Sequence, residues 1–181
     1  MLRALLVLLL WPSLLAAGEI VASGVERNGN RFVLFVDAHI QAPPAQVYRT
    51  ITDYENLAAI NPSFESSVVL GRKDGVDRVR TRIRVCILVF CKHVVQVQEM
   101  RYPDRDSIEA TMVPGAGDFH SGTARWSLSV IEGGTRLYFT ETFEPSFWVP
   151  PVIGPWLIRS KLVEEVEITM QHIEQQRGPS S

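Results

Sequence analysis

Residues 40–62 read IQAPPAQVYRTITDYENLAAINP, and this stretch decides the fold that the sequence predicts. Its first residues end an alternating segment at Pro43-Pro44, and proline is tolerated in the first turn of a helix. Apolar side chains then recur at helical spacing, at Val47, Ile51, Tyr54 and Ala58. Asp53 can cap a second short helical piece, and Asn61-Pro62 ends it. The stretch therefore predicts the end of a strand followed by two short helical pieces.

The residues on either side of this stretch predict β-strands. Upstream, residues 31–41 alternate with period two, and one face carries Phe32, Leu34, Val36, Ala38 and Ile40. Downstream, turn residues separate six strand-like segments, at about 64–70, 76–86, 91–100, 107–113, 123–131 and 135–143. Short connections between successive strands indicate antiparallel pairing.

The last element predicted is the longest helix, with Pro155 near its start. Its apolar stripe consists of Ile158, Leu162, Val166, Met170 and Ile173. Such a stripe has to be buried, and the sheet is the only large apolar surface available. The sequence therefore predicts an α+β fold, in which a curved antiparallel sheet of about seven strands wraps round a long C-terminal helix, with short helices after the first strand.

The composition fits one globular domain. The chain has 181 residues, of which 46% are hydrophobic, and this share is too high for a disordered or fibrous protein. Its 18 basic and 20 acidic side chains give a net charge of −2, far from the basic balance of nucleic-acid-binding proteins. Nucleic acid is therefore not an expected partner, and a monomer is expected.

Residues 1–18 have the features of a secretory signal peptide. Arg3 precedes a short leucine-rich run, and Ala16-Ala17-Gly18 fits a cleavage site. The run is short for a bilayer span of about 20 residues, although an uncleaved anchor is the alternative. The mature chain would have an N-terminal lead at 19–30, a domain at 31–176 and a tail at 177–181. The expected localisation is outside the cytoplasm, in the periplasm.

Export would place Cys86 and Cys91 in an oxidising compartment. Strand-like sequence leads into and out of the residues between them. If those residues form a hairpin loop, the cysteines face each other across its neck and can form a disulfide. Free thiols are the alternative, whereas a redox pair usually has two intervening residues.

The span from Phe32 to about Gln175 resembles the START-like, helix-grip superfamily, which includes polyketide cyclases, coenzyme Q-binding proteins and lipid-transfer domains. The stretch 40–62 is similar to that superfamily's first strand, paired helices and Asn-Pro ending. Gly122-Thr-Ala-Arg-Trp-Ser-Leu128 and Gly134-Thr-Arg-Leu-Tyr-Phe139 match its late strands. The resemblance implies a deep apolar cavity between the sheet and the helix that binds a hydrophobic molecule. These motifs specify the fold and not an activity.

The implied cavity would be lined by one face of the strands and by the C-terminal helix. The ligand-binding residues expected there are Val79, Ile83, Val85, Ile108, Met112, Trp126, Leu128, Phe139, Glu141, Phe143, Val166 and Met170. Ordinary core packing is the alternative for each apolar one. Glu141 shares the parity of Phe139 and Phe143, and a buried carboxylate has to be paired or protonated. Glu141 would contact the ligand, lie at the rim, or pair with an arginine.

One strand carries a row of cations on its other face. Arg78, Arg80, Arg82 and Arg84 alternate with Val79, Thr81, Ile83 and Val85, and four arginines cannot all be buried. A solvated face with Glu99 or Glu109 as cross-strand partners is expected. A patch for anionic lipid headgroups is the alternative.

Two stretches, residues 87–90 and 147–156, carry more apolar surface than a solvated loop needs. They either fold back to plug the cavity or form its mouth and contact a membrane, where interfacial Trp is favoured. The membrane-contact residues would be Phe90, Phe147, Trp148 and Trp156.

The sequence offers no recognisable catalytic or metal motif. The four histidines have no metal-ligand spacing, and no dinucleotide fingerprint or Gly-x-Ser-x-Gly is present. Asp118, His120 and Ser121 share a Gly-rich segment, but proximity in sequence is not a triad. No cofactor or metal is therefore expected.

Two functions fit these observations. The first is an exported protein that binds a hydrophobic small molecule, a lipid or an isoprenoid quinone, for carriage or presentation. The alternative is a polyketide cyclase or dehydratase that uses the inward carboxylate of Glu141 as its acid or base.

Overall fold

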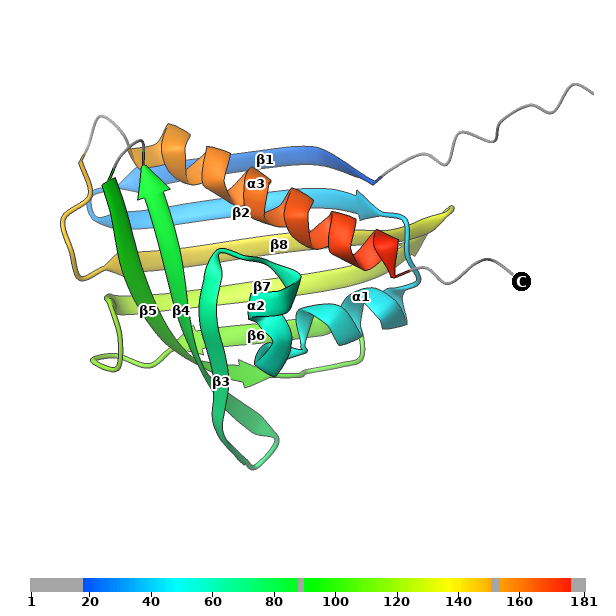
Figure 1. The fold of residues 1–181 in the computed structure, drawn as a ribbon, viewed down its shortest axis with the longest axis horizontal. Helices are drawn as coiled ribbons and strands as arrows, with labels where there is room; N and C mark the ends of the chain where they lie inside the picture. Colours follow the sequence, from blue (N-terminus) through cyan, green and yellow to red (C-terminus); the bar gives the residue numbers. More distant parts are fainter. Residues whose placement is uncertain (1–17, 88–89, 151–153, 177–181) are drawn as a thin grey trace, which may run out of the picture.

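The structure is a computed structural model that describes residues 18–87, 90–150 and 154–176. One sheet holds the strands in the order β1-β2-β8-β7-β6-β5-β4-β3, and every neighbouring pair is antiparallel (Figure 1). The elements are β1 (Glu19–Asn28), β2 (Arg31–Ile40), α1 (Pro44–Ile51), η1 (Tyr54–Asn56), α2 (Leu57–Ile60), β3 (Phe64–Lys73), β4 (Val76–Ile87), β5 (Phe90–Arg101), β6 (Ser107–Met112), β7 (Phe119–Ile131), β8 (Gly134–Pro145) and α3 (Gly154–Gln175).

The α+β helix-grip architecture predicted from the sequence is confirmed. In Figure 1, α3 runs obliquely across β1, β2 and β8, while β3, β4 and β5 cross the other strands steeply, so the sheet curves round the helix. The inner face is the face that packs against α3. Its buried core joins residues of β2, β4, β6, β7 and β8 to Met170 and Ile173 of α3.

The N-terminal lead differs from the sequence prediction. Most of residues 19–30 form β1, an edge strand antiparallel to β2, so the sheet has eight strands where about seven were predicted. The strand contains a bulge between Ile20 and Ala22 and a glycine at Gly24, which interrupt the alternation that identifies a strand in sequence.

Side chains of the stretch 40–62 hold it against α3 through hydrogen bonds. Asn61 is 2% exposed, and its side-chain amide donates to the carbonyl of Glu165 at 3.2 Å while its Oδ1 accepts from the backbone N–H of Ser63 at 3.0 Å. Gln46 donates to the carbonyl of Ile173 at 2.7 Å. Asp53 lies at the N-cap of η1, as predicted, but its carboxylate accepts from the Asn56 side chain and makes no backbone cap hydrogen bond.

The far end of α3 is tied to the sheet by one carboxylate. Glu174 Oε1 accepts from the backbone N–H of Gly18 and of Gln41, each at 2.9 Å. Within the described ranges, no helix is long and apolar enough to cross a membrane. The predicted signal peptide lies outside the described residues except for Gly18.

Candidate ligand-binding site

The strand register decides which side chains face α3. On β8, Glu141 pairs with Leu34 of β2 on one side and with Ala124 of β7 on the other, and both partners are buried in the core under α3. Glu141 therefore points to the inner face, as its parity predicted. Ala124 pairs in turn with Ala110 of β6.

The predicted ligand-binding residues divide into two groups by accessibility. Six are buried in the core: Val79, Ile108, Met112, Leu128, Phe139 and Met170. The other six keep part of their surface accessible: Ile83, Val85, Trp126, Glu141, Phe143 and Val166. The second group belongs to β4, β7, β8 and α3. We refer to these six partly accessible residues as the strip.

Glu141 is the polar member of this strip. None of the described residues donates a hydrogen bond to its carboxylate or lies within ion-pair distance of it, so the arginine pairing considered from the sequence is not formed there. Desolvation by the surrounding protein raises the pKa of Glu141 to about 7. Near neutral pH, the group can therefore hold or release a proton.

Aromatic side chains flank Glu141 along its strand. Phe139 contacts Trp126, with 4.9 Å between ring centroids. Phe143 stacks on Phe32 at 5.3 Å and meets Phe119 edge-on at 5.6 Å. The carboxylate thus lies between two aromatic groups along β8 and beside the small Ala124 of β7.

Sequence reasoning missed four side chains that complete this strip. Ile158 and Leu162 of α3 pack partly buried against the core, although their stripe was identified only as a packing face. Gln96 and Gln98 of β5 pair with Thr81 and Val79, so they too face inward. The alternation of Val94, Gln96, Gln98 and Met100 carried that signal in the sequence.

A second apolar cluster lies at the end of the sheet near the β4–β5 hairpin. Val94, Met112 and Phe119 form it, with Val85, Phe143 and Phe147 packed against them. The ring of Phe147 meets Phe119 at 6.5 Å, and the Lys92 ammonium lies 4.5 Å from its centroid. Phe147 is therefore packed against this cluster.

The other predicted membrane-contact residues are placed differently. Trp148 is 77% exposed and Trp156 is 74% exposed. The side chain of Phe90 lies outside the described residues. In Figure 1, the end of the β4–β5 hairpin and the start of α3 lie at the same end of the molecule.

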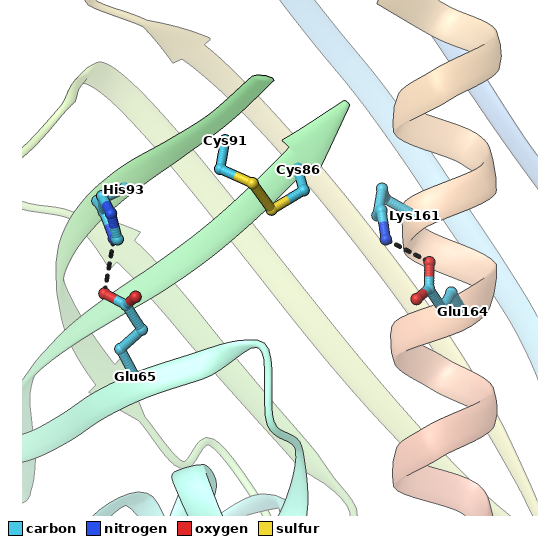
Figure 2. Close-up of a disulfide and its surroundings, with 6 residues drawn as sticks. All are labelled: Glu65, Cys86, Cys91, His93, Lys161 and Glu164. Carbon is cyan, nitrogen blue, oxygen red and sulfur yellow. Dashed lines mark hydrogen bonds and ion pairs between the residues drawn. A yellow bond between two sulfur atoms is a disulfide. The ribbon is translucent and has the colours of Figure 1, made fainter. Parts of the chain in front are cut away.

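Cys86 and Cys91 pair directly across this hairpin and form a disulfide with 4.0 Å between their Cα atoms. Figure 2 shows the disulfide joining β4 to β5, beside a hydrogen bond of 2.7 Å between His93 Nδ1 and the Glu65 carboxylate. On the neighbouring α3, Lys161 pairs with Glu164. The disulfide fixes the two strand ends at the tip.

The arginine row lies on the outer face, exposed to solvent. Arg78 pairs with Glu99 at 2.8 Å, as predicted, and Arg82 pairs with Glu65 at 2.9 Å. Glu109, the other predicted partner, instead pairs with Arg125. Glu65 was not foreseen because it occupies a bulge of β3, between the paired residues Phe64 and Ser66.

A buried polar network lies at the other end of β4. Asp77 is 1% exposed and receives a two-point hydrogen bond from Arg72 and one from the Tyr102 hydroxyl at 2.8 Å. The Arg72 hydrogen bonds hold the pKa of Asp77 below its ordinary value, although burial opposes them. Burial raises the pKa of Tyr54, whose hydroxyl lies 3.2 Å from that of Tyr102, to about 12. This network is fully bonded and anchors the β3–β4 turn to η1.

Two hollows on the described surface lie outside the interface between the sheet and α3. One of about 400 Å³ lies where α1 and α2 meet the end of α3, lined by Gln46, Arg49, Thr50, Asp53, Asn56, Ala59, Ile60, His172 and Gln176. The other, of about 260 Å³, lies over the outer face of β6, β7 and β8. Most of the residues that line it have outward parity: Glu109, Thr111, Thr123, Arg125, Thr140 and Thr142. The first was not predicted because its elements are far apart in sequence.

The segment that carries Asp118, His120 and Ser121 does not assemble a triad. The Asp118 carboxylate accepts from the backbone N–H of Val95 at 2.8 Å, so it supports the edge of β5. Across the described ranges, no group of three His, Cys, Asp or Glu side chains could hold a metal ion.

Comparisons with known proteins agree with this geometry. Residues 32–175 match the family described as polyketide cyclase / dehydrase and lipid transport. No curated protein matches the chain.

Several solved structures share the fold. TTHA0849 from Thermus thermophilus is 26% identical, with a TM-score of 0.57 over 79% of this chain and 94% of that one. A START superfamily protein from Mycobacterium smegmatis is 17% identical, with a TM-score of 0.68 over 80% of this chain and 99% of that one. The Zhui aromatase/cyclase from Streptomyces sp. R1128 is 14% identical, with a TM-score of 0.61 over 83% of this chain and 99% of that one.

Proposed function

The chain belongs to the polyketide cyclase / dehydrase and lipid transport family, and from this premise we propose that it binds a hydrophobic small molecule between the sheet and α3 and carries or presents it. The ligand class proposed is a lipid or an isoprenoid quinone. Such molecules are too apolar to travel freely through water, since each Å² of apolar surface exposed costs roughly 25 cal/mol.

One observation supports the proposal most directly. Protein interiors are close-packed, so inward-facing apolar side chains in mid-element are normally closed off from solvent. Here Trp126, Phe143 and Val166 pack against the core under α3, and each keeps accessible surface. Side chains arranged in this way can separate slightly to admit an apolar ligand and then contact it along its length.

The binding proposal can be tested with an environment-sensitive fluorophore and with a quinone. Trp126→Ala removes a partly accessible inner-face ring and should weaken binding about tenfold or more, which corresponds to about 1.4 kcal/mol. Tyr138→Ala is the matched control, because Tyr138 is an aromatic residue on the outer face, 41% exposed. Equal affinities of both variants and the parent protein would contradict the proposed site. Lipid extraction and native mass spectrometry of the protein from its own compartment would identify the ligand.

We also propose that the protein is exported and that residues 1–18 are removed. The disulfide between Cys86 and Cys91 supports this proposal, because such bonds persist in oxidising compartments. The start of β1 at Glu19, next to the proposed cleavage point, is consistent with it. N-terminal sequencing of the protein recovered from the periplasm should begin at or near Glu19, and recovery of the full chain would support the uncleaved anchor instead.

Transient membrane contact forms the last part of the proposal. Trp148 and Trp156 present large indole surfaces on either side of the entry into α3. Indole side chains partition to the interface between water and lipid. Contact there would let a ligand pass between bilayer and protein without crossing water.

An enzymatic function is the second candidate, and Glu141 favours it. A carboxyl group whose pKa is about 7 can serve as a general acid or base near neutral pH. The test is turnover of a polyketide-like substrate by the parent protein and by Glu141→Gln. Turnover that stops in the variant while binding persists would establish the enzyme, and binding without turnover in either protein would favour carriage.

A further inference from the structure

We propose that Glu141 makes the ligand site selective for apolar molecules that end in a protonated amine, over those that end in a hydroxyl or a carboxylate. This inference rests on the proposed function, because it concerns the ligand that the same site would take. It goes further by assigning the chemistry of the ligand's polar end, and it narrows the ligand to an amine-bearing lipid, because a quinone has no amine. Three features of the molecule support it: an unpaired carboxylate, the small residues beside it, and the aromatic rings around it.

The carboxylate of Glu141 lacks a counter-charge. The other inward-facing acid of the inner face, Asp77, is already bonded to Arg72 and Tyr102. The inward-facing cation of β1, Arg27, lies over the ring of Phe32 at 5.1 Å and donates to the carbonyl of Gly29. Neither Arg27 nor any other described cation comes within ion-pair distance of the Glu141 carboxylate. A carboxylate in this position is therefore open to a cation or donor brought by a ligand.

The neighbours of Glu141 on the side of β6 and β7 are small. Ala124 lies directly opposite on β7, and Ala110 lies beyond it on β6, so two successive strands present only a methyl group in this row. Larger residues in these positions would cover the carboxylate from the side of β6 and β7.

The rings complete an environment that suits an ammonium group. Phe139 and Phe143 flank Glu141 along β8, and Trp126 packs on Phe139. Aromatic faces attract cations, most strongly where water is excluded. A charged carboxylate here is costly because it is desolvated, and an ammonium group would offset that cost with a charge-assisted hydrogen bond. A ligand carboxylate would instead place two negative charges in one poorly hydrated site.

The test compares three probes that share one alkyl chain: decylamine, decanol and decanoate. Each displaces an environment-sensitive fluorophore from the full-length protein at about pH 8, where Glu141 is ionised. Decylamine should bind at least about tenfold more tightly than decanol, and decanoate more weakly than decanol. In Glu141→Gln, decylamine should lose about tenfold in affinity, while decanol should change little. Glu144→Gln is the matched control, because it removes the same charge from the outward parity of the same strand.

The outcomes separate this inference from the proposed function. Tight binding of all three probes without the predicted order, or an amine preference that survives in Glu141→Gln, would overturn the amine selectivity and leave the hydrophobic site standing. Failure of the fluorophore and of every probe to bind would overturn both. Loss of the amine preference in Glu144→Gln as well would show a general charge effect and would also overturn the inference.

Discussion

Gly134, the first residue of β8, lies against the backbone carbonyl of Ile40 at the end of β2, so that a Cβ atom on residue 134 would come within 2.1 Å of that oxygen. The clash would involve the backbone of β2 and β8, which cannot move aside as a flexible side chain can. We expect Gly134→Ala to lower the free energy of unfolding by about 2 kcal/mol or more in urea unfolding.

Gly71→Ala provides the control for this steric argument. Gly71 also lies in a strand, and a Cβ atom there would meet nothing within 4 Å. We expect its effect to stay within about 0.5 kcal/mol. If Gly134→Ala were equally harmless, the close packing of the β2 and β8 ends would be wrong.

The two late motifs that resembled a known superfamily begin at Gly122 and Gly134, and both glycines have a physical reason to be there. A Cβ atom on Gly122 would lie 2.6 Å from Met112 Cγ. Regular alternation identified the strands β2 and β4 in the sequence, as Arg78 and Val79 illustrate on β4. The strand β1 lacks that alternation because of its bulge and Gly24, and it therefore escaped detection.

Removal of the disulfide should have a modest effect. The bond closes a loop of only a few residues, so its entropic stabilisation should lie toward the lower end of about 2–4 kcal/mol. Cys86→Ala with Cys91→Ala should lower the free energy of unfolding by that amount without changing ligand affinity. Thiol labelling of the unfolded, unreduced exported protein should find no reactive cysteine, and labelling of both residues would contradict the bond.

Glu141 should make the protein less stable as the pH rises. Its pKa rises from 4.5 in the unfolded chain to about 7 in the folded protein, so between these values the folded state binds more protons. Stability should therefore fall across this window and level off above it. Glu141→Gln should remove the decline and add up to about 3 kcal/mol above pH 7, measured by urea unfolding at a series of pH values. A parallel decline in parent and variant would show that another group causes it.

Asp77 should produce the opposite dependence at acid pH. Its folded pKa is lowered, chiefly by the hydrogen bonds from Arg72, so its contribution is present above the unfolded value of 3.8 and is lost as the pH falls through the folded one. Arg72→Met should cost about 1–3 kcal/mol at neutral pH and move the acid unfolding limb to higher pH. Arg80→Met, an exposed residue of the arginine row, should do neither.

The sequence pattern predicts on which face of the sheet a side chain lies, and the candidate site could be predicted only to that extent. Parity placed Glu141 on the inner face, because a strand alternates regularly. Parity could not show that Val79 would be closed off while Ile83 stays accessible, because this depends on how far β4 curves away from α3. Phe147 and Trp148 are adjacent in sequence, yet one is packed on Phe119 and the other is exposed, and only the path of the loop decides between them.

Membrane contact at Trp148 can be tested by its effect on transfer kinetics. Trp148→Glu would place a charge where the indole is expected to enter the lipid interface, so transfer of a fluorescent lipid between vesicles should slow several-fold. Stability and equilibrium ligand affinity should barely change, because a residue that is 77% exposed contributes little to the core. Val130→Glu is the matched control, since Val130 is 78% exposed and lies beside the β7–β8 turn, at the opposite end of the sheet from the start of α3 (Figure 1). Equal slowing of transfer by both variants would show an effect of overall charge. If Trp148→Glu lost stability while transfer was unchanged, the segment would serve as packing, and the proposed membrane contact would have to be abandoned.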